Sequence, residues 1–285
     1  MKTKGKKHRG RGCLTALIVV ALIAAFCAFI IKDSRDELEI SRYEVASSKL
    51  SESFDGFTIV QLSDLHGAQF GEDGTELVDK VRELAPDIIA LTGDFVTEEG
   101  DLEAEEKLAP RLTEICPVYF VSGNHEFGSG LAAEVRNIME SAGVKYLSNE
   151  YLTISRGEDH ILLGGVEDPN AYADMLTPEE LAQKMNEASP SAFKILLGHR
   201  NYWMEKYPEL PVDLVLCGHA HGGLVRIPGA GGLIGTDRHL FPDFVDGEFN
   251  NGNYTMIVSR GLGNSVPIPR IFNRPEIVCV TLRAE

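Results

Sequence analysis

Five short apolar runs in this sequence end in glycine and in residues with carboxylate, amide or imidazole groups. In the clearest case, residues 117–122 are rich in β-branched and aromatic side chains and lead into Gly123-Asn124-His125-Glu126. Such runs favour buried strands, whereas Gly-Asn-His-Glu cannot continue one. In α/β proteins, ligands bind beyond the carboxyl ends of the strands. The repeated pattern therefore predicts a sheet edge that carries the functional groups.

The other four runs end in the same way. Residues 57–62 precede Ser63-Asp64-Leu65-His66-Gly67, residues 87–91 precede Thr92-Gly93-Asp94, residues 193–197 precede Gly198-His199, and residues 212–217 precede Gly218-His219-Ala220-His221-Gly222-Gly223. Alternate residues of an extended segment point to the same side. Asp64 with His66, and His219 with His221, can therefore converge on one centre. The adjacent glycines give the backbone freedom and room for close approach.

The residue types at these strand ends are those of a metal site. Carboxylate oxygens and imidazole nitrogens without thiolates suit Mn, Fe and Zn. A carboxylate shared by two ions would hold them about 3.5–4 Å apart, the spacing of two-metal ester hydrolysis. The five cysteines form no Cys-x-x-Cys pair and lie in or beside apolar runs. They are typical of small buried hydrophobic residues, not of a thiolate zinc site or a disulfide framework.

The N-terminal region predicts a membrane anchor. Residues 1–12 form a basic tail, and residues 13–31 contain no charged side chain. As a helix, residues 13–31 would be about 28 Å long, close to the hydrocarbon thickness of a bilayer. A cleaved signal peptide is the alternative, but the run is longer than a usual signal core and no small-x-small cleavage site follows it. A buried core helix fits poorly behind a basic tail.

The distribution of charge predicts an orientation for the anchor and excludes one class of partner. Six of the 27 basic residues fall within residues 1–12, which contain no acid, and only Lys32 and Arg35 follow the apolar run closely. The positive-inside rule then keeps the N-terminus cytoplasmic and places the rest outside a cell membrane that is crossed once. A net charge of −16 makes the body acidic, so no nucleic-acid partner is expected.

Residues 37–285 predict one α/β domain. Helices are expected near 75–84, 101–113, 131–141 and 177–186; strands alternate with helices in the first half and dominate the second. This order favours a four-layer αββα sandwich of two mixed β-sheets flanked by helices. Residues 38–45 are expected to pair with residues 57–62 as a hairpin. Residues 228–253, rich in Gly, Asp and Asn, are expected to form a long loop.

The ordered set of motifs resembles the calcineurin-like metallophosphoesterase superfamily. The motifs are Asp-x-His, Gly-Asp, Gly-Asn-His-Glu, Gly-His and Gly-His-x-His, and the match runs from about residue 57 to the C-terminus. Asp-x-His or Gly-Asp alone would carry no weight, whereas the combination is highly specific. The anchor, Asp-Leu-His-Gly, Gly-His-Ala-His-Gly-Gly and residues 261–276 are similar to a bacterial membrane-associated branch. That branch includes phosphodiesterases like the UDP-2,3-diacylglucosamine hydrolases.

The resemblance implies a site with two divalent metal ions (Mn, Fe or Zn). One ion would be bound by Asp64, His66, Asp94 and His221, and the other by Asp94, Asn124, His199 and His219, so that Asp94 bridges them. A hydroxide between the ions would attack phosphorus, and His125 would protonate or stabilise the leaving oxygen. Some relatives place an Asp three residues after the bridging Asp, where it can pair with the catalytic His. This chain has Thr97 there, so that support is not expected.

Further residues are candidates for supporting roles. Asn264 and Arg270 are candidates for a contact with substrate phosphate, since Arg offers a bidentate fork. Glu126 is expected to cap the following segment or to orient a ligand. Asp168 is expected to lie in a turn.

The sequence thus predicts a membrane-anchored, metal-dependent phosphoric ester hydrolase of phosphodiesterase type, acting on an envelope or lipid-linked phosphodiester or pyrophosphate. The alternative is a membrane-tethered envelope-binding protein with a non-catalytic metal site; the intact ligand set counts against it. A phosphoprotein phosphatase is disfavoured, because no Asp-Arg-Gly follows Gly-Asp. The oligomeric state does not follow from the sequence.

Overall fold

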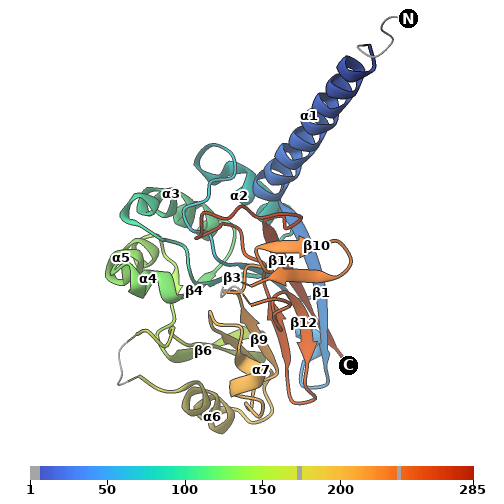
Figure 1. Cartoon of the computed structure of the whole chain (residues 1–285). Helices are drawn as coiled ribbons and strands as arrows, with labels where there is room; N and C mark the ends of the chain where they lie inside the picture. The colour runs from blue at the N-terminus through green and yellow to red at the C-terminus, as the bar shows by residue number, and fades with distance from the viewer. Residues whose placement is uncertain (1–6, 172–174, 236–238) are drawn as a thin grey trace, which may run out of the picture.

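A long N-terminal helix projects from an α/β body (Figure 1). The computed structural model describes residues 7–171, 175–235 and 239–285, with side chains from residue 14 onward. The helices are α1 (Lys7–Asp36), α2 (Thr75–Glu83), α3 (Leu102–Thr113), α4 (Asn124–Gly128), α5 (Ala132–Ser141), α6 (Pro178–Ala188) and α7 (Trp203–Lys206). Short 3-10 helices span Glu52–Phe54, Glu72–Gly74 and Glu99–Asp101.

The first sheet has the strand order β1-β14-β2-β3-β4-β5. Its strands are β1 (Glu39–Ser47), β14 (Glu276–Ala284), β2 (Thr58–Leu62), β3 (Ile88–Thr92), β4 (Val118–Val121) and β5 (Lys145–Tyr146). All neighbours in this sheet are parallel except β14 and β2. The carboxyl ends of β2, β3 and β4 therefore lie side by side at one edge.

The second sheet has the order β12-β13-β9-β8-β7-β6. Its strands are β12 (Gly247–Asn250), β13 (Thr255–Val258), β9 (Leu214–Cys217), β8 (Lys194–Leu197), β7 (Asp159–Gly165) and β6 (Glu150–Arg156). The inner strands β13, β9, β8 and β7 are parallel, and β12 and β6 are antiparallel edge strands. A separate hairpin is formed by β10 (Val225–Ile227) and β11 (Gly231–Ile234).

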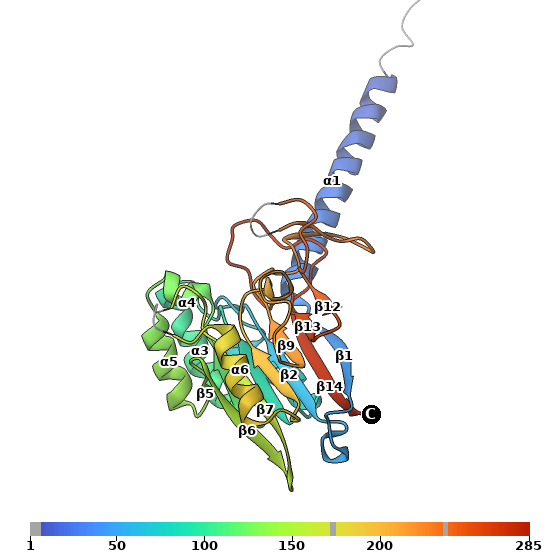
Figure 2. The ribbon, with the colours of Figure 1, turned by 90° about the horizontal axis from the view of Figure 1, so that it is seen from below.

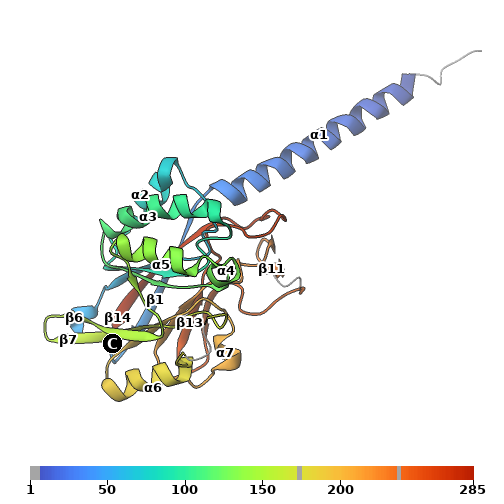
Figure 3. The same cartoon turned by 90° about the vertical axis from the view of Figure 1, so that its left-hand side faces the viewer.

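Three apolar cores hold four layers together. On β3, Ile89 packs toward the helices while Ile88 and Ala90 pack between the sheets, as expected for alternating strand residues. On β8, Ile195 packs between the sheets and Leu196 packs toward α6. Figure 3 shows α2, α3 and α5 over one face of the stack and α6 and α7 over the other. The predicted αββα sandwich of two mixed sheets is confirmed.

Helix α1 extends beyond the predicted anchor. It includes residues 7–12 of the basic tail and continues past Ile31 to Asp36. The most apolar 18-residue stretch within Leu14–Asp36 has a mean hydropathy of 3.0 and is almost entirely exposed. Within the described residues, no other helix is long and apolar enough to cross a membrane. Figure 2 shows α1 leaving the body without packing along either sheet.

Two expectations about the chain path are wrong. Strand β1 does not form a hairpin with β2; it pairs in parallel with β14, from Glu39 opposite Glu276 to Ser47 opposite Ala284. Strand β14 is buried on both faces and therefore takes the inner position, whereas β1 is half-exposed and suits an edge. Residues 228–253 are also not a continuous loop, because they contain β11 and β12.

Candidate metal centre

Both sheets deliver polar side chains to one point. The loop after β2 carries Asp64 and His66, and the loop after β3 carries Asp94. These two loops are hydrogen-bonded to each other, from the Asp64 N–H to the Gly93 carbonyl (2.9 Å) and from the His66 N–H to the Asp94 carbonyl (3.1 Å). Asn124 and His125 begin α4 directly after β4. The second sheet supplies His199 after β8 and His219 and His221 after β9.

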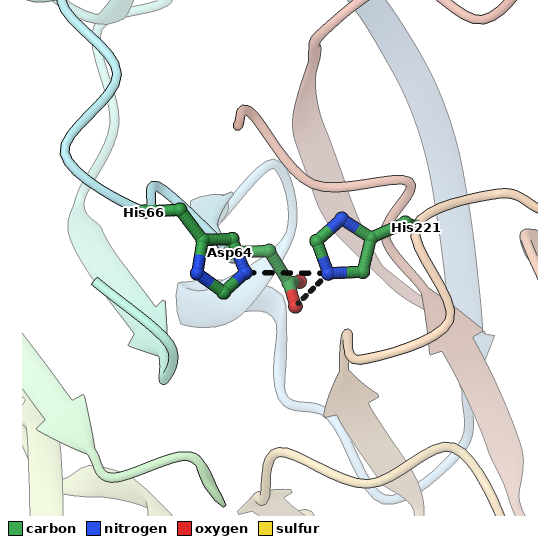
Figure 4. Close-up of side chains that lie close together, drawn as sticks. All are labelled: Asp64, His66 and His221. Atoms are coloured by element: carbon green, nitrogen blue, oxygen red, sulfur yellow. Dashed lines mark hydrogen bonds and ion pairs between the residues drawn. The ribbon is translucent and has the colours of Figure 1, made fainter. Parts of the chain in front are cut away.

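The first group of donors comprises Asp64, His66 and His221. Figure 4 shows the Asp64 carboxylate and the two imidazoles turned toward a common point. His221 Nε2 lies 3.4 Å from Asp64 Oδ1 and 3.3 Å from His66 Nε2. All three residues are buried, and one donor atom from each lies within 4.8 Å of the other two. This is the spacing of ligands around a single cation.

The second group comprises Asp94, His199 and His219. Asp94 Oδ2 lies 3.0 Å from His199 Nε2, and His219 Nδ1 lies 3.2 Å from the same nitrogen. The Asn124 amide oxygen is also 3.2 Å from His199 Nε2. Asp94 Oδ2 in addition lies 3.9 Å from His66 Nε2 of the first group. Asp94 thus lies between the two groups, in the position of a shared ligand.

The charges at this centre favour a cation. Burial is the largest influence on His219 and lowers its pKa to about 2, and burial also lowers the pKa of His66 well below its usual value. For His199, burial is outweighed by the charge and hydrogen bond of Asp94, which raise its pKa to about 10. Neutral imidazoles beside buried carboxylates are metal-binding forms. A divalent ion would take the place of the proton that Asp94 and His199 share.

The backbone is strained at the same residues. Five of the predicted ligands have a positive φ: Asp64 (52°), His66 (48°), Asp94 (56°), His219 (70°) and His221 (51°). This left-handed region is uncommon outside glycine, although Asp and His enter it more readily than most residues. Strain of this kind costs on the order of 1–3 kcal/mol per residue and clusters at functional sites. Its concentration on the donor residues supports a site built for binding.

Two glycines allow the donors to approach the backbone. A Cβ atom at Gly123 would lie 2.2 Å from Asp94 Oδ1, and one at Gly218 would lie 2.3 Å from Asp64 Oδ2. Both contacts are far inside van der Waals distance. No larger residue fits at either position while the carboxylates keep their places, which agrees with the close approach expected from the sequence.

A shell of hydrogen bonds orients the donors. Glu126 is buried and accepts from the backbone N–H groups of Asp94 (3.0 Å), Phe95 (2.6 Å) and Gly123 (2.7 Å). It therefore both caps α4 and fixes the loop of Asp94, the two roles expected for it. His199 Nδ1 lies 2.8 Å from the Thr92 carbonyl. Such contacts select the imidazole tautomer that leaves the other nitrogen free to bind.

Thr97 supports a different histidine from the one considered in the sequence. Its Oγ1 lies 2.7 Å from His66 Nδ1. The structure thus uses this position to orient a predicted ligand and not His125. The backbone N–H of Thr97 is in turn held by Asp101 Oδ2 at 2.7 Å.

His125 lies at the centre beside both donor groups. Its ring is 4.8 Å from that of His66, edge to face, and its backbone N–H donates to Asp94 Oδ1 at 2.8 Å. One of its ring nitrogens is within 4.8 Å of donor atoms of His66 and Asp94. The side chain is partly exposed, unlike those of His66 and Asp94. This position allows contact with a bound molecule.

Asn264 and Arg270 serve the structure of a loop. Arg270 is 5% exposed, and its guanidinium donates to the carbonyls of Arg260, Gly261, Gly263 and Asn273. The Asn264 amide donates to Val266 and Ile268 carbonyls. With every guanidinium nitrogen engaged by its own loop, Arg270 has no fork to offer a phosphate. It stabilises the segment next to Asp64. In that segment, the Gly263 N–H donates to the Asp64 carbonyl at 2.6 Å.

Arg200 is the cation that the sequence analysis missed. Its guanidinium is held by two bonds to Asp168, at 2.5 and 3.2 Å, and its Nη1 lies 3.2 Å from His219 Nε2. Asp168 is buried and is therefore an ion-pair partner and not simply a turn residue. In the sequence, the only signal for a role of Arg200 was its position directly after His199. The pairing with Asp168 depends on a long-range contact that residue spacing does not predict.

A cavity of about 510 Å³ adjoins the second donor group. Its lining includes His219, Tyr202 and Glu205, and also Leu240 and Phe241. It therefore combines polar groups near the donors with large apolar side chains. The donor set, the charge balance and the adjoining cavity together fit a divalent-metal centre with space for a substrate.

The comparisons with known proteins agree with this chemistry. A metallophosphoesterase from Bacillus subtilis, YkuE, is 28% identical over 87% of this chain and 86% of its own length. A phosphodiesterase from Escherichia coli, YaeI, is 28% identical over 79% and 82%. A transmembrane protein with a metallophosphoesterase domain from Danio rerio is 26% identical over 96% of this chain and 63% of its own length. Together with α1, the last relative supports membrane anchoring.

A family model described as calcineurin-like phosphoesterase matches residues 57–223, which contain all seven predicted metal ligands and His125. This chain belongs to the calcineurin-like phosphoesterase family.

Proposed function

We propose that this protein is a membrane-anchored hydrolase that cleaves phosphodiesters or pyrophosphates of envelope or lipid-linked molecules with the help of two divalent metal ions. The observation that carries the proposal is the pair of donor groups joined through Asp94, assembled from five strand ends of two sheets. A purely structural role would not require so many buried donors to face one another.

The residues divide into two ligand sets. Asp64, His66, Asp94 and His221 would hold one ion, and Asp94, Asn124, His199 and His219 the other. Mn, Fe and Zn all accept such nitrogen and oxygen ligands. When bound, the ions would lower the pKa of an attacking water and neutralise charge that develops on the phosphate.

Two further residues would act on the substrate. His125 is partly exposed and adjoins both groups, so it can donate a proton to the leaving oxygen. Arg200 is fixed by Asp168 beside His219, which suits it to hold a phosphate oxygen in place of Arg270. The rigid ion pair with Asp168 would orient the guanidinium before substrate arrives.

Preference for a diester over a monoester is supported by two observations. The Escherichia coli relative is named a phosphodiesterase. The cavity of about 510 Å³ beside His219 gives a second substituent on phosphorus a place to lie. Its apolar side chains favour a substituent with hydrocarbon character. With the N-terminus cytoplasmic, as the basic tail predicts, the site would act on the outer side of the membrane.

The test is hydrolysis by the full-length chain in detergent. An aryl phosphodiester and the matching monoester would be offered to metal-stripped protein and to protein loaded with Mn or Zn. We expect metal-restored cleavage that favours the diester, absent in Asp94→Asn and strongly reduced in His125→Ala. A folded protein that binds two ions and yet cleaves neither these esters nor a lipid-linked pyrophosphate would contradict the proposal and favour a tethered binding protein.

A further inference from the structure

The C-terminal end of helix α1 is hydrogen-bonded to a loop near the candidate metal centre. Ser34 of α1 is buried, and its hydroxyl accepts from the Asn273 N–H at 3.3 Å. Asp33 pairs with Arg274 through two bonds, at 2.6 and 2.9 Å. These contacts lie two to three residues beyond the last apolar residue of the span, Ile31. The loop around Asn273 is therefore held where the helix leaves the membrane.

Exposed apolar side chains gather in this neighbourhood. Outside α1, the exposed large hydrophobic residues of the described chain all fall in three segments, the end of β10 and two loops: Ile227 (40% exposed), Leu240 (66%), Phe241 (64%), Ile268 (45%) and Phe272 (41%). We call these five residues the apolar rim. Scattered single exposures are normal on a protein surface, but a set confined to one region marks an interaction surface.

Main-chain bonds join the three segments into one unit. The Phe241 N–H donates to the Leu233 carbonyl on β11, and the Leu224 N–H donates to Ile234. The Ile271 N–H donates to the Leu224 carbonyl at 3.2 Å, and Arg226 N–H donates to Ile271 at 3.0 Å. Through Asn273 the unit reaches Ser34. Figure 3 shows β11 and the neighbouring loops on the side of the body from which α1 projects.

Two rim residues are presented by strained backbone. Phe241 has a φ of 52° and Phe272 a φ of 53°. Bulky side chains rarely adopt this left-handed conformation. Here both aromatic side chains are also exposed, Phe241 to 64% and Phe272 to 41%, so neither is buried in the core. Aromatic side chains that combine strain with exposure are consistent with a binding role.

We propose that the apolar rim docks on the surface of the same bilayer that α1 crosses. The fastening of the rim to α1 places it at the membrane boundary, and Lys32 and Arg35, both more than 70% exposed, supply charge at the level of the lipid head groups. Phenylalanine and isoleucine then enter the interface while the charged side chains remain in the head-group layer. The occupant of this surface is lipid and not a second protein.

Docking would determine the path by which a substrate reaches the metal centre. Leu240 and Phe241 belong both to the rim and to the lining of the cavity that reaches His219. The cavity would then open at the bilayer surface, and a phosphoester carried by a lipid could reach the ligands without leaving the membrane. This consequence rests on the proposed function, whereas docking itself does not.

The test uses fluorescence quenching by lipids brominated on their acyl chains. Single tryptophans are introduced by Phe241→Trp or Phe272→Trp in full-length protein carrying Trp203→Phe, reconstituted in phosphatidylcholine and phosphatidylglycerol vesicles. Trp203 is buried among apolar side chains, so phenylalanine keeps an apolar aromatic ring at this position. Phe26→Trp in α1 is the positive control. Glu158→Trp, in the exposed β6–β7 turn remote from α1, is the negative control.

We expect brominated lipid to quench Phe241→Trp and Phe272→Trp at least half as strongly as Phe26→Trp, and to leave Glu158→Trp unchanged. If Phe241→Trp does not fold, Leu240→Trp reports on the same loop. Quenching of Phe26→Trp without quenching at 240 or 241 overturns the proposal, even if Phe272→Trp is quenched. Measuring quenching and hydrolysis on the same metal-loaded protein separates the two ideas, because quenching without hydrolysis would leave docking intact and overturn only the proposed function.

Discussion

The edge that carries the metal donors and the apolar rim are built by different means. The donors follow regular strands, are mostly buried and are oriented by a network that includes Glu126, Thr97 and Thr92. The rim lies in two irregular loops and at the end of the short strand β10, is exposed and is joined by a few main-chain bonds. On the proposed function, regular structure in this chain would fix the chemistry, and the apolar rim would govern which substrates reach it.

The largest effect is expected at the residue that joins the two donor groups. Asp94→Asn removes the carboxylate charge shared by both groups, so metal binding should fall at both and hydrolysis should drop below detection. Metal content by mass spectrometry and ester cleavage would be measured together. If Asp94→Asn keeps two ions and normal turnover, the donors do not form one joined centre.

His125→Ala should separate catalysis from metal binding. Loss of a general acid lowers kcat by about 10²- to 10⁴-fold, while the metal content should remain that of the unchanged protein. His160→Ala is the matched control, since His160 lies exposed on β7 and its side chain is hydrogen-bonded to the Ser189 hydroxyl, away from the donors. A His125→Ala protein that has lost its metal would instead identify His125 as a ligand.

Thr97→Val should weaken metal binding at the donor edge without removing a ligand. The substitution keeps the shape of the side chain and deletes the oxygen 2.7 Å from His66 Nδ1. Loss of such an orienting contact costs about 10- to 100-fold in metal affinity or activity. Thr153→Val on the exposed strand β6 serves as control. Equal metal affinity in both variants would show that His66 does not depend on Thr97.

Changes in the apolar rim should affect the access of lipid-borne substrate to the site more than the hydrolysis step itself. The double variant Leu240→Ser with Phe241→Ser should lower hydrolysis of a vesicle-borne diester, relative to a soluble aryl diester, by about 3- to 10-fold. Partial burial of two such side chains is worth on the order of 1 kcal/mol. The ratio of the two rates is the measured quantity. An unchanged ratio would mean that the rim does not guide lipid-borne substrate.

The smallest effect, a change in stability, is expected at Glu105 on α3, which lies behind the sheet edge that carries the donors. Burial, followed by the charges of Glu126 and Asp101, raises the pKa of Glu105 well above 4.5, and neither carboxyl oxygen has a hydrogen-bond partner among the described residues. The folded protein therefore binds a proton here that the unfolded chain releases above pH 4.5, so stability falls as pH rises beyond that value.

Glu105→Gln should remove this pH dependence. The variant should melt a few degrees higher than the unchanged protein at pH 7 to 8, and the difference should disappear near pH 4. Thermal melts across this range measure it. A variant that is less stable at pH 8 would show that Glu105 is ionised and bound to a partner.

The sequence predicted that the candidate donor residues meet at one edge, because strands and the residues at their ends are local patterns. Asp64, Asp94 and His199 each follow an apolar run directly, so periodicity and residue type were sufficient to locate them. The two sheets and the flanking helices followed from the same runs. Carboxyl ends of parallel strands meet at one edge, and this topology brought distant residues together without further information.

The predictions failed for features that are determined by long-range contacts. The partner of β1 is β14, at the opposite end of the chain, and the alternation of residues 38–45 says nothing about which strand lies beside it. Arg270 was expected to contact phosphate, yet loop closure surrounds its guanidinium with carbonyls. Arg200 was missed because its orientation depends on Asp168 across the fold. None of these contacts has a signature in local spacing.

The central claim is that two ions bind side by side and share Asp94. Electron paramagnetic resonance of the Mn-loaded, full-length protein tests it directly, because two Mn ions joined by a carboxylate about 3.5–4 Å apart are magnetically coupled. We predict a coupled two-manganese spectrum that is lost in Asp94→Asn and retained in His125→Ala. A spectrum of isolated, uncoupled Mn in protein that hydrolyses esters at full rate would contradict the shared centre.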